Sequence, residues 1–110
     1  MEQALLVITN LPDAVLAGAL ARQLVEQGLA ACVNTLAGVK SVYRWQGAIE
    51  EANETCLLIK TTQSAYSQLE LAIKAAHPYD LPEIIAIPIV AGWPPYLDWI
   101  TQETKKGLHV

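Results

Sequence analysis

The sequence lacks several features that mark particular classes of protein. It has no run of Lys and Arg, and its net charge is −4, which argues against a nucleic-acid partner or an anionic membrane surface. No stretch approaches the roughly 18 consecutive apolar residues that a membrane-spanning helix needs. The opening residues, MEQALLVITN, lack the basic segment of a secretory signal peptide. We therefore expect a cytoplasmic protein that binds neither nucleic acid nor membrane.

Cysteine is also scarce, and glycine forms no phosphate-binding motif. Cys32 and Cys56 follow neither a CxxC nor a zinc-finger spacing, as expected for free thiols in a reducing compartment. Cys32 and His77 could in principle act as nucleophile and base, but no Asp or Asn is evident to orient the base. We expect no enzymatic activity.

Charged residues are few, at 16% of the chain, while apolar residues reach 53%. Soluble domains average about 25% charged residues. A chain of 110 residues forms one domain, because a core of this size fills a single two-layer unit. Such a small domain does not easily hide so much apolar surface. We therefore expect a single domain over residues 1–110 that assembles with copies of itself.

The spacing of apolar residues predicts four strands and three helices. In chain order, we expect a strand at 4–10, a helix at 12–27, strands at 30–45 and 49–61, a helix at 64–76, a strand at 83–91, and a helix within 92–106. This order predicts an α+β, ferredoxin-like βαββαβ sandwich with an extra C-terminal helix. In that topology the last strand lies at a sheet edge, and Pro88 supports this because proline cannot donate a ladder hydrogen bond.

The two long strands form a hairpin whose charged residues could face one another. If Trp45 faces Ile49, opposite charges pair across the strands. The pairs are Arg44 with Glu50 and Lys40 with Glu54. We therefore interpret this part of the hairpin as a solvated, charge-paired face rather than a site for a hard cation.

The segment HPYDLPEI, residues 77–84, lies where the second helix ends. Pro78 restricts the preceding residue to extended geometry, so His77 marks the helix exit. An imidazole with the carboxylates of Asp80 and Glu83 would suit Cu(II) or Zn(II). A histidine at a helix end can equally bond the free carbonyl groups of the last turn. Structural and metal-binding interpretations of His77 both remain open.

Five fragments in order resemble the CutA divalent-cation tolerance family. They are LAACVN, SVYRWQG, LLIKTT, HPYDLPEI and YLDWI, and they extend the resemblance from about residue 5 to residue 100. The resemblance implies a ferredoxin-like protomer in a PII-like homotrimer, with hairpin arms and edge strands pairing between subunits. It also implies a role in metal tolerance and weak binding of Cu(II) or another divalent cation, without a tightly bound cofactor.

The candidate metal ligands are His77, Cys32, Glu83 and Asp80. Some family members carry a second His just before His-Pro-Tyr and a Cys near the end of the first strand, whereas Ala76 and Thr9 stand here. A metal bound at His77 should therefore be held weakly, or should recruit Cys32 or a carboxylate. For Cys32, the competing interpretation is a small buried apolar residue.

Lys60 supports a second hypothesis, because it lies in an otherwise apolar stretch. Its ammonium group either extends outward from a buried strand end or points into a cleft between subunits. A PII-like scaffold or sensor could use Lys60 to contact a small anionic ligand or a partner protein.

Overall fold

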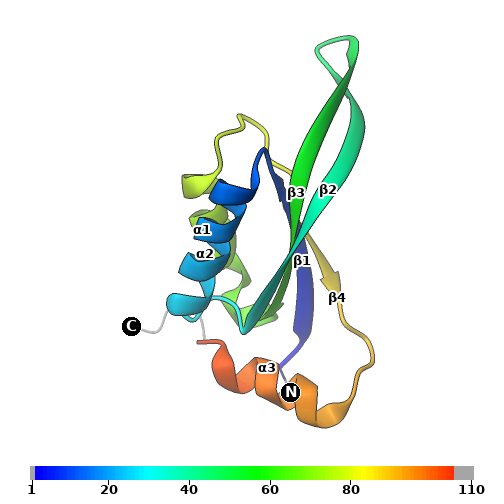
Figure 1. Ribbon diagram of the computed structural model, residues 1–110. Coiled ribbons are helices and arrows are strands. Elements are labelled where there is room, and N and C mark those ends of the chain that lie inside the picture. Colours follow the sequence, from blue (N-terminus) through cyan, green and yellow to red (C-terminus); the bar gives the residue numbers. More distant parts are fainter. Residues whose placement is uncertain (1, 106–110) are drawn as a thin grey trace.

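A four-stranded antiparallel sheet with two helices on one face forms the body of the molecule (Figure 1). The computed structural model describes residues 2–105. In chain order the elements are β1 (Ala4–Leu11), α1 (Ala14–Glu26), β2 (Cys32–Trp45), β3 (Ala48–Thr62), a short 3-10 turn (Gln63–Ala65), α2 (Tyr66–Ala76), β4 (Ile85–Pro88) and α3 (Pro94–Glu103). The sheet order β2-β3-β1-β4 confirms the predicted ferredoxin-like topology and the position of β4 at an edge, and α3 confirms the predicted C-terminal helix. In residues 2–105, no helix is long and apolar enough to cross a membrane.

The core lies between the sheet and the helices α1 and α2. Alternate residues of β1 and β3 point toward the helices, and Val7 and Ile59, which pair across these strands, are fully buried. The helices contribute side chains at helical spacing, among them Leu24 from α1 and Ile73 from α2. Asp13 caps α1, because its carboxylate accepts a hydrogen bond from the Leu16 N–H at 2.8 Å.

The opposite side of the sheet, which we call the open face, is covered by residues 2–105 at one end only. There α3 packs Ile100 against Ala4 and Ala31. The remaining apolar residues of the open face are half-buried or exposed: Leu6, Ile8, Leu36, Leu58, Ile85 and Ile87. Part of the surplus apolar surface expected from composition therefore lies on this side of the sheet.

The hairpin register differs from the prediction by one residue. Trp45 pairs with Ala48, because Gln46 and Gly47, with φ of 50° and 85°, form a two-residue turn rather than a three-residue one. The predicted ion pairs are therefore wrong: Arg44 faces Ile49 and Lys40 faces Asn53. Nearer the sheet, a bulge between Leu36 and Val39 contains Gly38 with φ of 75°.

Two predicted element boundaries are also corrected. Ser64 does not cap α2; it lies in the 3-10 turn, and its backbone N–H and hydroxyl both bond the carboxylate of Glu2. The last strand is shorter than the predicted 83–91, because pairing with β1 begins at Ile85 and ends at Pro88.

Thr9 offers a test of packing on the helix-facing side of β1. It is fully buried, and its Oγ1 has no hydrogen-bond partner within residues 2–105. An unpaired buried hydroxyl destabilises the folded state, so Thr9→Val should raise the free energy of unfolding by about 1 kcal/mol. The matched control is Thr61→Val, which removes the bond from Thr61 Oγ1 to the Leu29 carbonyl and should lower stability by a similar amount. Urea denaturation at one protein concentration measures both, and equal losses in the two variants would contradict the assignment.

Candidate functional site

His77 is a buried hinge residue at the C-terminal end of α2. Its side chain is 8% exposed. Nε2 lies 2.7 Å from the Asn10 carbonyl oxygen, and Nδ1 accepts the Tyr79 N–H at 3.2 Å. A carbonyl only accepts and an N–H only donates, so these partners fix a neutral ring with its proton on Nε2. Both ring nitrogens are therefore engaged in tying the segment 77–84 to β1.

Glu54 is a buried carboxylate that the sequence interpretation missed. It is 9% exposed; Oε1 accepts the Ser41 hydroxyl at 2.5 Å and Oε2 accepts the Tyr79 hydroxyl at 2.9 Å. The predicted solvated pairing with Lys40 is wrong, because the register shift places Lys40 opposite Asn53. No cationic side chain of the described residues lies within 4.0 Å of Glu54. Two hydroxyl donors, those of Ser41 and Tyr79, therefore fix the position of the carboxylate.

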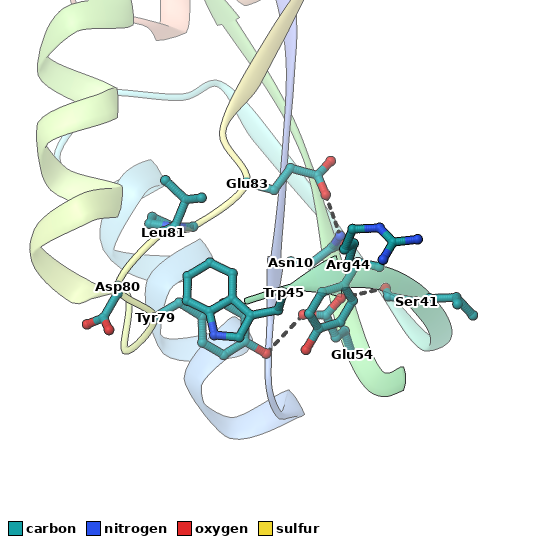
Figure 2. Close-up of a pocket in the computed structure, with 12 residues that line it drawn as sticks. Asn10, Ser41, Arg44, Trp45, Glu54, Tyr79, Asp80, Leu81 and Glu83 are labelled. Carbon is teal, nitrogen blue, oxygen red and sulfur yellow. Dashed lines mark hydrogen bonds between the residues drawn. The ribbon is translucent and has the colours of Figure 1, made fainter. Parts of the chain in front are cut away.

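A pocket of about 780 Å³ lies between the hairpin and the segment 79–83. Figure 2 shows its labelled side chains, including the bonds from Tyr79 and Ser41 to Glu54. Three carboxylates line it, Glu54, Asp80 and Glu83, against one guanidinium, that of Arg44. This excess of negative charge makes the pocket attractive to cations.

The negative charge extends from the pocket onto the adjoining end of the open face. Glu83 accepts a hydrogen bond from the Asn10 side-chain amide at 3.1 Å, and Asn10 pairs with Cys56 across β1 and β3. The pKa of the Cys56 thiol is raised by burial and, to a smaller extent, by the charges of Glu83 and Glu54. Cys56 therefore lies in the field of two carboxylates, which opposes formation of a reactive thiolate.

Cys32 and Lys60 lie at the other end of the open face. They pair across β2 and β3, and Lys60 Nζ is 4.0 Å from Cys32 Sγ and also bonds the Asn34 side-chain oxygen. Lys60 is level with Leu6 on β1, four residues from Asn10, or about 13 Å along the strand.

The four predicted ligands are therefore not gathered in one place. Asp80 and Glu83 line the pocket, His77 is bonded within the fold, and Cys32 lies beside Lys60. The described residues contain no group of three or more His, Cys, Asp or Glu side chains positioned to hold one metal ion.

Tyr79 supplies a pH-dependent signature for this site. Burial, followed by the hydrogen bond and the charge of Glu54 and by Tyr43, raises the pKa of Tyr79 to about 12 from 10.0. The folded state then holds a proton that the unfolded state releases between these values, so the contribution of Tyr79 to stability is complete below pH 10 and is lost as the pH rises toward 12. Ultraviolet titration of tyrosinate in wild type and Tyr79→Phe should show one late-ionising group missing from the variant. An unchanged high-pH transition would contradict the Tyr79–Glu54 bond.

Comparison with known proteins shows extensive similarity. The family model for the CutA1 divalent ion tolerance protein matches residues 5–103. The Thermus thermophilus divalent-cation tolerance protein CutA is 46% identical over 104 residues, covering 94% of this chain and 99% of that protein. Mouse protein CutA is 43% identical over 86% of this chain, which spans 53% of the mouse protein.

Solved structures agree with these sequence matches. The Thermus thermophilus structure superposes with a TM-score of 0.90 over 96% of this chain and 100% of its own. The crystal structure of CutA1 from Oryza sativa, 38% identical, gives 0.91 over 94% of each chain.

Proposed function

Because this chain belongs to the CutA1 divalent ion tolerance protein family, we propose that it contributes to tolerance of divalent cations as a cytoplasmic homotrimer that binds copper or another divalent cation weakly. The family is not known for an enzymatic activity. The two free cysteines are consistent with a cytoplasmic location, since thiols stay reduced there.

The observation that carries the cation-binding proposal is the surplus of carboxylates in the pocket. Asp80 and Glu83 are exposed at its wall, so they can bind a hydrated cation without first losing a buried partner. Asp80 and Glu83 lie on opposite sides of Tyr79, so a cation meets one exposed carboxylate at a time. Even small hard cations take six ligands, and the rest of the shell is filled by water. Binding should therefore be weak and exchangeable.

His77 and Cys32 as metal ligands remain predictions, and each has a physical cost. A metal at His77 must replace either the Asn10 carbonyl or the Tyr79 N–H and leave that group unpaired. A metal at Cys32 lies beside the ammonium of Lys60, 4.0 Å away, which repels it. A further donor from another subunit would have to offset these costs.

The proposed homotrimer would bury the open face and join free sheet edges. β2 and β4 are the outer strands, and exposed apolar residues continue along the same side of the hairpin arm, where Tyr43 is 45% and Trp45 is 39% exposed. Apolar surface of this extent favours association, and pairing of β2 with β4 of another copy would satisfy the free backbone groups of both edges.

The cation-binding proposal is tested by titration with Cu(II) and Mn(II), because carboxylates suit Mn(II) and imidazole suits Cu(II). The variant Asp80→Asn/Glu83→Gln should bind Mn(II) several-fold more weakly than wild type. Glu50→Gln is the matched control, since Glu50 is an exposed carboxylate of β3 outside the pocket lining. Equal affinity of wild type and the double variant for both metals would reject the pocket as the binding site.

A further inference from the structure

Lys60 is a half-buried residue whose ammonium group has no anionic partner among residues 2–105. Its Nζ contacts Cys32 Sγ and the Asn34 side-chain oxygen, and Arg22 with Glu26 is the one ion pair between described side chains. Its neighbours on the open face include the apolar side chains of Leu6 and Leu58. Covering this face would remove the water that now solvates the charge, at a cost that an opposite charge must offset.

Glu83, at the other end of the same face, is a carboxylate without a cationic partner among residues 2–105. It is exposed, its Oε1 accepts one bond from the Asn10 amide, and no cationic side chain of residues 2–105 lies within 4.0 Å of its carboxylate. After burial, the charges of Glu83 and Glu54 also raise the pKa of the Cys56 thiol. Covering this end would also require a cation.

We propose that Lys60 of one copy forms an ion pair with Glu83 of a neighbouring copy when the open faces assemble. This inference rests on the proposed homotrimer and adds the contact that sets its register. The open face carries a cation at one end, an apolar centre at Ile8 and Ile85, and carboxylates at the other end. A second copy turned so that its Lys60 end meets this copy's Glu83 end matches charge to charge.

Such a contact joins two different patches, so the same contact can repeat around a threefold axis and close a ring. Each subunit then gives one ammonium to the subunit before it and receives one from the subunit after it. In the proposed trimer a divalent cation at Glu83 therefore competes with the neighbour's Lys60, which keeps cation binding weak.

Among the pocket carboxylates, Glu83 fits this role best. Glu54 is 9% exposed and already accepts two hydroxyl groups. Figure 2 shows Asp80 pointing away from Asn10, on the far side of Tyr79 from Glu83. Glu83 is directed toward Asn10, a residue of the open face.

Subunit exchange measures the proposed pair even if the trimer is too tight to dissociate on dilution. Wild-type protein is mixed with an isotopically heavy copy, and native mass spectrometry follows the mixed species over time. Lys60→Met and Glu83→Gln should each accelerate exchange about tenfold, because either change leaves a buried charge unpaired. The double variant should exchange no faster than either single variant, since the partners are then lost together.

Charge reversal adds a stricter comparison. Lys60→Glu and Glu83→Lys should each weaken assembly further, and their combination in one chain should restore exchange to within a few-fold of wild type. Lys74→Glu, at an exposed position of α2 on the other side of the sheet, is the control and should leave exchange unchanged. Circular dichroism of each variant separates loss of assembly from loss of folding; if the reversals do not fold, the neutral variants decide.

The outcomes separate this inference from the proposed function. A wild-type protein that is monomeric in native mass measurements overturns both the homotrimer and the pair. If the protein is a trimer but Lys60→Met does not change the rate of subunit exchange, the ion pair alone is rejected. The same holds if the effects of Lys60→Met and Glu83→Gln on that rate are additive. If citrate or phosphate stabilises wild type but not Lys60→Met while exchange is unaffected, Lys60 binds a free small anion and the intersubunit pair is rejected.

Discussion

Replacing His77 with alanine should lower the free energy of unfolding by about 3 kcal/mol. The change removes the bond to the Asn10 carbonyl and the bond from the Tyr79 N–H, and each group left unpaired and buried costs roughly 1–3 kcal/mol. It also detaches the segment 77–84 from β1, so the Tyr79 hydroxyl should bond Glu54 less well. Urea unfolding monitored by circular dichroism gives the loss directly.

His77→Phe is the informative companion, because it keeps most of the ring volume while removing both hydrogen bonds. It should lose nearly as much stability as the alanine variant. Leu81→Ala in the same segment is the control, because Leu81 is 73% exposed and its loss should change stability by less than about 0.5 kcal/mol. A His77→Phe variant as stable as wild type would show that the two bonds contribute little.

The structural role of His77 complicates its use in assigning a metal site. A His77→Ala variant that binds less copper has also lost the anchor of Asp80 and Glu83. Weaker binding would then reflect a displaced segment as readily as a missing ligand. The carboxylate variants, which leave the hinge intact, give the cleaner measurement.

The second large effect is expected in the core, at Ile73 of α2. Ile73 is fully buried against the sheet, so Ile73→Ala should lower the free energy of unfolding by about 3–4 kcal/mol, from lost apolar burial and the remaining cavity. Leu71→Ala, two residues away on the same helix, is the matched control. Leu71 is 58% exposed, and alanine favours helix, so its replacement should be nearly neutral. Similar losses at both positions would contradict the observed packing of α2.

The topology was predictable because it follows from local patterns. The alternation in β1, the helical spacing of Leu16, Leu20 and Leu24, and Pro88 near an edge each depend on residues close in sequence. The register of the hairpin could not be predicted, because Gln46 adopts a positive φ and glutamine is not a residue type that favours this conformation. One residue of error was enough to assign the wrong neighbours to Arg44 and Lys40.

The site was predictable only in part for a similar reason. The segment 77–84 was correctly placed at the exit of α2, and Asp80 and Glu83 do line a pocket with it. Glu54 was missed because its donor Tyr79 is 25 residues away and its other donor, Ser41, depends on the hairpin register. The bond from His77 Nε2 could not be predicted either, because its partner, the Asn10 carbonyl, lies 67 residues earlier in the sequence.

The bulge at Gly38 sets the direction in which the hairpin arm projects from the sheet. Seven residues, Val39 to Trp45, project beyond it, a reach of about 23 Å, so each degree of bend moves the tip by about 0.4 Å. The φ of 75° at Gly38 is one that other residue types adopt only at a cost of about 1 kcal/mol. Deleting this glycine would leave the cross-strand partners of the arm intact while straightening it. In the proposed trimer, the position of the tip relative to a neighbouring subunit would thus depend on a residue at the base of the arm.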